Sequence, residues 1–190
     1  MAEVLSALSK KLVSGHYGPA GDAGIRLSGR RLRGLWQLAG WANFETAAAS
    51  ALEALGLSTI GTFQSAQATQ IACAWRIAPD KLLVESAHDL GAFNSQDLAV
   101  LNLSHAREAI ILSGPAARDL LSQLIAIDVS PAAFRRGAFL QTGIHHVGVL
   151  IHCVEETDFE ILVPTTWAES GWEVLLENAL PFGLEVHSNA

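Results

Sequence analysis

The stretch AIILSGPAARDLLSQL, residues 109–124, decides the fold because it changes from strand to helix within a few residues. Its first four residues, 109–112, are apolar and favour a strand. The Ser113-Gly114-Pro115 sequence then opens a helix, since proline costs nothing in a first turn, where its missing N–H has no partner. The helix shows one apolar face, made by Leu120, Leu121 and Leu124. This stretch therefore predicts helices packed on a sheet.

Further elements flank this stretch on both sides. After it, apolar runs predict strands at 139–142, 147–154, 159–163 and 184–186. Thr166 and Glu169 form a capping box for a second helix, which ends before Pro181. Before the stretch, we expect a helix at 44–55 and strands at 34–41, 60–63, 69–77, 81–85 and 98–103.

The order strand–helix–strands–helix–strand is a split βαβ pattern, and the first half of the chain repeats it loosely. We therefore expect an α+β fold with two lobes of split βαβ (ferredoxin-like) units on mostly antiparallel sheets. An N-terminal helix and a glycine-rich loop are expected at residues 1–33. The remaining residues, 34–190, are expected to form a single unit with lobes at about 34–97 and 98–190.

The composition excludes several classes of protein. The chain has 190 residues, of which 50% are hydrophobic and 16% are charged, so it is too apolar to be disordered. Its net charge of −7 argues against general nucleic-acid binding, which needs a basic surface. No window is long and apolar enough for a membrane span, and the first twelve residues make a poor signal peptide. We therefore expect a cytoplasmic location.

Motifs for chemistry are absent or weak. No phosphate-binding or nucleophile motif occurs, and the glycines at 15, 18, 21 and 24 fit a flexible loop or a segment that orders against a partner or phosphate. Cys73 and Cys153 lie in apolar runs, as buried reduced thiols do. A zinc site would use His145, His146, His152 and Cys153. Residues 146 and 152 would lie about 20 Å apart on one strand, which argues against it.

The sequence also indicates structural roles for most of the other polar and aromatic residues. Ser104-His105 and His88-Asp89 resemble parts of catalytic dyads, but a strand-end hydroxyl and a turn pair explain them better. The run Arg26, Arg30, Arg31 and Arg33 predicts a solvated loop or a docking patch for an acidic partner. We expect most tryptophans to be buried and one or two to lie at an interface; they are Trp36, Trp41, Trp75, Trp167 and Trp172.

Several motifs in combination resemble a known superfamily. They are NLSH at 102–105, SGPAARDLL at 113–121, QT at 141–142, and FEILVP with WAESGW between 159 and 172. They look like the folate-binding domain of the glycine-cleavage aminomethyltransferase. In particular, the chain resembles the gamma subunits of heterotetrameric sarcosine oxidases, which share its length and the run ILSGPAARDLL. The resemblance covers residues 98–180 well, 34–85 loosely and 1–33 hardly at all.

The resemblance implies a non-catalytic subunit of a complex that oxidatively demethylates sarcosine to glycine with oxygen and tetrahydrofolate. It places FAD, FMN, NAD and tetrahydrofolate in the alpha and beta subunits and zinc in the delta subunit, and no cofactor in this chain. Folate-acting relatives carry acidic residues near the strand that here reads GVLI, residues 148–151. Because these residues are apolar, we assign no catalytic, cofactor-binding or metal-binding residue.

Two alternatives remain open at this point. The chain could be a stand-alone folate-binding one-carbon transferase or an iron–sulfur-assembly helper of the same superfamily. Such a protein needs a carboxylate near the pterin, and Asp128 and Asp158 are the nearby acids to consider. The second alternative, a metal-dependent hydrolase, would have to use the histidines named above.

Overall fold

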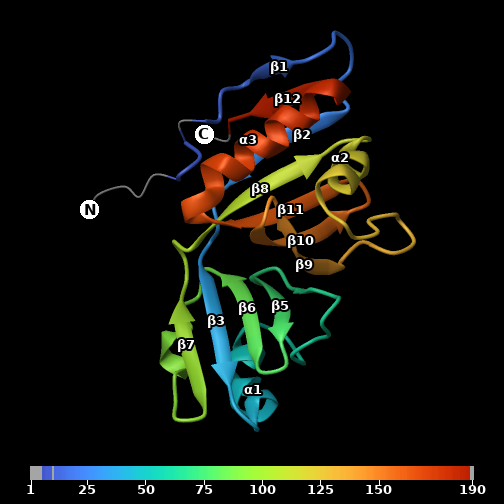
Figure 1. Cartoon of the computed structure of the whole chain (residues 1–190). Coiled ribbons are helices and arrows are strands. Elements are labelled where there is room, and N and C mark those ends of the chain that lie inside the picture. The colour runs from blue at the N-terminus through green and yellow to red at the C-terminus, as the bar shows by residue number, and fades with distance from the viewer. Residues whose placement is uncertain (1–5, 10, 189–190) are drawn as a thin grey trace. The chain divides into compact units, whose positions relative to one another are not determined.

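The chain divides into two units, each with its own sheet and its own core. The computed structural model describes residues 6–9 and 11–188. The first unit combines residues 1–31 with residues 106–190, and the second unit spans Leu32–His105 (Figure 1). Both units are mixed α/β with mainly antiparallel sheets, which confirms the predicted fold class. The division falls after residues 31 and 105, whereas the expected lobes divide near residue 97.

The first unit contains a seven-stranded sheet. All neighbouring strands are antiparallel except β12 and β2, which are parallel. In spatial order the strands are β1 (Gly15–Tyr17), β12 (Leu184–His187), β2 (Ile25–Arg30), β8 (Arg107–Ser113), β11 (Asp158–Pro164), β10 (Val147–Glu155) and β9 (Phe139–Ile144).

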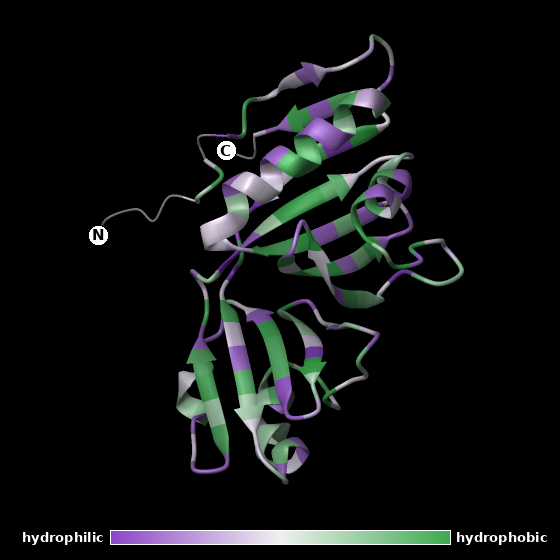
Figure 2. Ribbon diagram, in the orientation of Figure 1, coloured by the Kyte–Doolittle hydropathy of each residue, from purple (hydrophilic) through white to green (hydrophobic). Residues whose placement is uncertain are grey.

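The core of this unit lies between the sheet and two helices, α2 (Ala117–Leu124) and α3 (Ala168–Ala179). Figure 2 shows β8 as an almost continuous apolar strand. The strand registers place Leu27, Leu112, Phe159 and Cys153 side by side on the helix-facing side of the sheet. All four contribute to the core, and burying a large apolar side chain stabilises a fold by about 1.5–3 kcal/mol.

The second unit contains a five-stranded, fully antiparallel sheet. In spatial order its strands are β4 (Gln67–Ala68), β5 (Ala72–Ala78), β6 (Lys81–Ser86), β3 (Leu35–Gly40) and β7 (Leu98–Asn102). Helix α1 (Phe44–Ala54) buries Phe44, Ala48 and Leu52 in one cluster with the strands. Gly56 ends the helix with a φ of +69°, as a glycine at that position commonly does. A 3₁₀ helix, η1 (Gly91–Phe93), precedes β7.

The N-terminal region differs from its prediction. Residues 6–9 and 11–13 form turns and irregular backbone in place of the expected helix, whose other residues lie outside the described part of the chain. Leu8 is nevertheless fully buried in the core of the first unit. Residues 15–17 and 25–30, expected to be loop, form β1 and β2. Leu8 is therefore buried without helical structure, whereas Val13 is 62% exposed.

The glycine-rich segment is held by the chain itself. The Gly24 N–H donates to the Phe182 carbonyl at 3.0 Å, and the Gly24 carbonyl accepts from the Ala116 N–H at 3.0 Å. A Cβ at Gly24 would lie 2.5 Å from the Phe182 carbonyl oxygen, so a side chain has no room there. The prediction of a flexible loop is wrong for this part of the segment. Through these two hydrogen bonds, Gly24 bridges the start of α2 and η3 (Leu180–Phe182), a 3₁₀ helix that precedes β12.

Two local predictions in the remainder are also wrong. Residues 60–63 form no strand. The capping box of Thr166 and Glu169 is absent, because η2 (Thr165–Trp167), a 3₁₀ helix, leads directly into α3 and no side chain caps the helix. Among the described residues, none of the helices has the length and hydropathy needed to cross a membrane.

Candidate functional site

The main candidate site is an apolar pocket in the first unit. It has a volume of about 280 Å³ and lies between the end of β9, the start of β10, β11 and α3. Its wall is made mostly of aliphatic side chains, including Ile144, Val149, Val163 and Leu175. Beside these, only His145, Ser170 and the indole of Trp167 bring polar groups to the lining. The pocket therefore suits an apolar group.

The hairpin between β9 and β10 shapes one side of this pocket. Its two-residue turn is His145-His146, and both residues have positive φ angles, of +46° and +69°. Two-residue hairpins favour this backbone because it follows the twist of the strands, although glycine and asparagine suit it better than histidine. The turn brings His145 to the pocket wall.

This turn gives a stability prediction. We expect His146→Gly to stabilise the protein by about 0.5–1 kcal/mol, since the left-handed conformation costs a residue with a Cβ about 1–2 kcal/mol and glycine loses part of that gain as entropy. His146→Ala is the control, because it removes the imidazole and keeps the strain. Chemical denaturation measures both free energies of unfolding. A gain for alanine equal to that for glycine would contradict the argument.

Helix α3 forms the opposite wall, and Gly171 lets it approach the sheet closely. A Cβ at Gly171 would lie 3.3 Å from Cγ1 of Val163 on β11, so the glycine leaves little space between helix and strand. Trp167, just before the helix, is 52% exposed although it also lines the pocket. An exposed indole beside an apolar hollow is typical of surfaces that bind other molecules.

The residues that a folate site would need are not brought together. Val149, Leu150 and Ile151, where folate-acting relatives are expected to carry acids, are at most 5% exposed. Asp128 lies in the loop after α2 and accepts a hydrogen bond from the Ser130 N–H at 2.8 Å, which lowers the pKa of its carboxyl. Asp158 stands on β11 opposite Ser113. Neither acid lines the apolar pocket. The lining of the apolar pocket therefore holds no carboxylate.

The residues considered as zinc ligands, and rejected from their spacing, are dispersed in the structure. His152 and Cys153 are neighbours on β10, and Cys153 contributes to the helix-facing core whereas His152 is paired in register with Glu160. His145 and His146 lie in the hairpin turn. Within residues 6–9 and 11–188, no group of three or more histidine, cysteine or acidic side chains could hold a metal ion.

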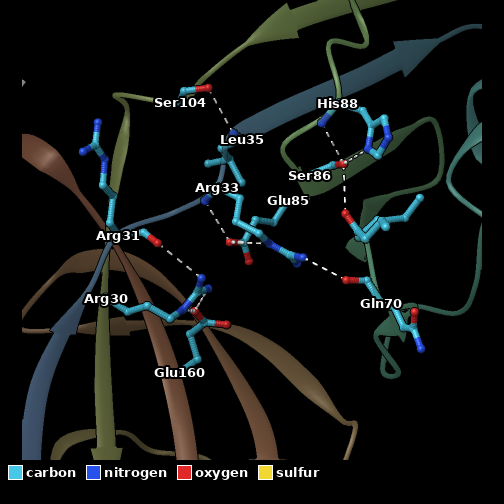
Figure 3. A network of polar contacts seen from close by, with 12 residues as sticks. Arg30, Arg31, Arg33, Leu35, Gln70, Glu85, Ser86, His88, Ser104 and Glu160 are labelled. Carbon is cyan, nitrogen blue, oxygen red and sulfur yellow. Dashed lines mark hydrogen bonds and ion pairs between the residues drawn. The ribbon is translucent and has the colours of Figure 1, made fainter. Parts of the chain in front are cut away.

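The two apparent dyads have structural roles, as expected. The Ser104 hydroxyl accepts a hydrogen bond from the Leu35 N–H at 3.1 Å. Asp89 accepts from the Gly91 N–H at 2.8 Å, and His88 Nδ1 lies 3.3 Å from the Ser86 hydroxyl. Ser104 therefore serves the start of a strand, and His88 contacts the end of another (Figure 3). Asp89 serves a turn.

The arginine run is only in part the solvated loop that its charge predicts, because Arg31 and Arg33 are exposed in irregular backbone but the other two arginines lie on a strand. Arg26 and Arg30 lie on β2, where Arg26 pairs with Glu185 at 3.3 Å and Arg30 Nε donates to Glu160 at 2.8 Å. In the second unit, the Arg33 backbone N–H donates to Glu85 at 3.1 Å, and its Nε lies 3.6 Å from the same carboxylate. The carboxylates of Glu160 and Glu85 are almost fully buried, so Arg30 and Arg33 neutralise interior charges (Figure 3).

Sequence reasoning missed the structural role of Arg118 on α2. Its guanidinium donates to the backbone carbonyls of Val129, of Phe134 at 3.0 Å and of Glu156 at 2.9 Å. It also lies over the Phe159 ring, 5.0 Å from the centroid. One side chain thus fastens the loop after α2 and the β10–β11 turn to the core. The motif contained the residue, but the carbonyls that it binds have no sequence signature.

The two cysteines differ in environment, and both are free thiols. Cys153 is fully buried, and this burial raises the pKa of its thiol although Arg118 opposes the effect. Because the thiolate is the reactive form, we expect iodoacetamide to label the half-buried Cys73 first and Cys153 only after unfolding. Mass spectrometry of native and denatured samples measures this, with Cys73→Ser as the control. Equal labelling in the native state would contradict it.

A second pocket, in the second unit, is larger and more polar. It has a volume of about 870 Å³ and lies between α1 and residues 57–67. Arg76 on its wall donates to the Pro79 carbonyl at 2.8 Å, pairs with Glu45 at 3.5 Å and lies over the Phe63 ring. The guanidinium of Arg76 therefore already binds the turn after β5, the start of α1 and the Phe63 ring.

The prediction that most tryptophans are buried is confirmed. Trp36, Trp75 and Trp172 are at most 8% exposed, whereas Trp41 and Trp167 are 65% and 52% exposed. Of the two exposed indoles, only that of Trp167 lines the apolar pocket.

The mixed α/β fold with mainly antiparallel sheets is that of a folate-binding-domain superfamily member. The chain belongs to the family of the GCVT N-terminal domain, whose model matches residues 73–188. No curated protein matches the sequence.

Two solved structures are similar in fold. A chain of the heterotetrameric sarcosine oxidase from Corynebacterium sp. U-96 superposes with a TM-score of 0.74 at 21% identity, over 86% of this chain and 87% of that one. The glycine cleavage system aminomethyltransferase T from Bartonella henselae superposes with a TM-score of 0.57 at 18% identity, over 86% of this chain and 47% of that one. This chain thus spans about half of the aminomethyltransferase.

Proposed function

We propose that this chain is the non-catalytic gamma subunit of a heterotetrameric sarcosine oxidase, bound to alpha, beta and delta subunits in the cytoplasm. The observation that carries the proposal is the extent of the likeness to the sarcosine oxidase chain. It spans 86% of this chain and 87% of that one. The aminomethyltransferase chain is covered to only 47%, so the likeness to the sarcosine oxidase chain is the more extensive of the two and favours an equivalent subunit.

The interior of the first unit supports a role without folate chemistry. Val149, Leu150 and Ile151 are buried and apolar. Asp128 lies in the loop after α2 and Asp158 lies on β11, so the two acids belong to different elements. In this proposal the partner subunits hold FAD, FMN, NAD, tetrahydrofolate and zinc, and they perform the oxidative demethylation of sarcosine. This chain supplies a folded surface that stabilises them.

Co-purification tests the proposal. The tagged chain is expressed with the alpha, beta and delta subunits of a sarcosine oxidase from the same source, and the eluate is separated by size. We expect one large species that contains this chain and shows flavin absorbance, and no sarcosine turnover by the chain alone. A free chain beside an intact flavoprotein would overturn the proposal. Stoichiometric binding of tetrahydrofolate by the isolated chain would favour a one-carbon transferase instead.

A further inference from the structure

We propose that the apolar pocket beside α3 receives an apolar side chain from a basic segment of a partner subunit, with Trp167 as the aromatic anchor of the contact. This inference rests on the proposed function and assigns its docking surface. The pocket is the hollow lined by residues of β9, β10, β11 and α3 described above.

The size and lining of the pocket select the kind of group that enters. Its volume of about 280 Å³ is at the lower end of the ~300–1,000 Å³ of typical small-molecule sites, and a dry apolar cavity of ~150 Å³ already holds a benzene ring. One aromatic or aliphatic side chain therefore fits. With His145 and Ser170 beside the Trp167 indole, the lining has few polar groups to orient a polar ligand.

Charge around the pocket selects the flanking residues of the occupant. Residues of α3 that line the pocket include Ser170, Gly171 and Val174. At 3.6 residues per turn, Glu173 and Glu177 lie on the adjoining exposed face of the helix.

These acids are only partly neutralised. Lys11 pairs with Glu173 at 2.6 Å and lies 3.8 Å from Glu169, so one cation serves two carboxylates. In the described part of the chain, no ion pair engages Glu177. The chain as a whole carries a net charge of −7. Lysine or arginine next to the apolar anchor complements this surface, and an arginine can also stack on the exposed face of Trp167.

Affinity measurements on the assembled complex test the surface. Wild-type chain and four variants are each titrated with the co-expressed alpha, beta and delta assembly that lacks this chain. The variants are Trp167→Ala, Val174→Glu, the charge reversal Glu173→Lys with Glu177→Lys, and Trp41→Ala as the matched control. Circular dichroism and thermal melting establish that every variant is folded.

We expect Trp167→Ala and Val174→Glu to weaken binding about tenfold or more, as central anchors do. The charge reversal should slow association and flatten its salt dependence. Trp41→Ala should stay within about twofold of wild type, since it removes an exposed indole that belongs to the second unit and does not line the pocket.

The outcomes separate this inference from the proposed function. If the wild-type chain binds and all variants bind equally well, the docking surface is wrong and the subunit role stands. Equal losses at Trp41 and Trp167 would also overturn the surface, because the effect would not be specific to the pocket. If the wild-type chain does not bind, both proposals fail. A small molecule retained in native mass spectra of wild type, and lost in Val174→Glu, would assign the pocket to a ligand and overturn docking.

Discussion

Gly114→Ala is expected to destabilise the protein by about 2–6 kcal/mol, because the substitution meets two penalties at once. Gly114 has a φ of +115°, a conformation that L side chains rarely adopt. A Cβ there would also lie 2.4 Å from the backbone carbonyl oxygen of Gly24. That carbonyl accepts the hydrogen bond from the Ala116 N–H at the start of α2, so it cannot retreat without breaking the contact.

Two further glycines separate the penalties. Gly137 has a φ of +79°, but no atom lies within 4 Å of the position that a Cβ would take, so Gly137→Ala should show the backbone strain alone, about 1–3 kcal/mol. Gly148 on β10 has neither a positive φ nor a neighbour within that distance. Gly148→Ala should be neutral or stabilising by up to about 1 kcal/mol.

Chemical denaturation measures the free energies of unfolding of the three alanine variants, which should fall in the order Gly148→Ala, Gly137→Ala, Gly114→Ala. Hydrogen exchange of the Ala116 amide, which donates to the Gly24 carbonyl, reports whether the contact between α2 and the N-terminal segment has opened. If Gly114→Ala is no worse than Gly137→Ala, the close backbone approach at Gly24 contributes nothing to stability, and the penalty at Gly114 is backbone strain alone.

The elements around Gly114 illustrate which parts of the fold can be predicted from the sequence and which cannot. Residues 98–187 carry strong local signals, such as the apolar runs and the Gly114-Pro115 helix start, and their strands and helices lie where the pattern predicts them. Strand β2 was missed because arginines and Gly29 dilute its alternation. Its partners, β8 and β12, are distant in the sequence, so their pairing leaves no local trace.

The candidate site depends even more on tertiary register. Val149 and Val163 are predictable as buried strand residues, but a pocket exists only where Gly171 and Val174 of α3 meet them. The arginine run illustrates the same limit. Its charge predicts a solvated loop, and only the sheet register shows that Arg30 reaches Glu160 across β8. Periodicity finds elements, whereas sites arise from how the elements pack.

Arg30→Met is expected to destabilise the first unit by about 3–5 kcal/mol, because it removes the guanidinium from a buried carboxylate. Glu160 is 5% exposed, and both Nε, at 2.8 Å, and Nη2 of Arg30 donate to its Oε1. An ionised carboxylate that loses such a partner keeps its desolvation cost. The exposed pair of Arg26 and Glu185 provides the matched control on the same strand, and Arg26→Met should cost less than about 1 kcal/mol.

A double-mutant cycle distinguishes the pair from the loss of packing by the arginine stem. We expect Glu160→Gln to restore part of the stability of Arg30→Met, because a neutral amide costs less to bury than a carboxylate that has lost its arginine. The coupling energy between the two positions should reach about 1–3 kcal/mol in urea unfolding. A coupling energy of zero would show that the aliphatic stem of Arg30, and not its charge, stabilises the sheet. High salt should leave the coupling largely unchanged, since a buried pair is screened far less than the exposed Arg26–Glu185 pair.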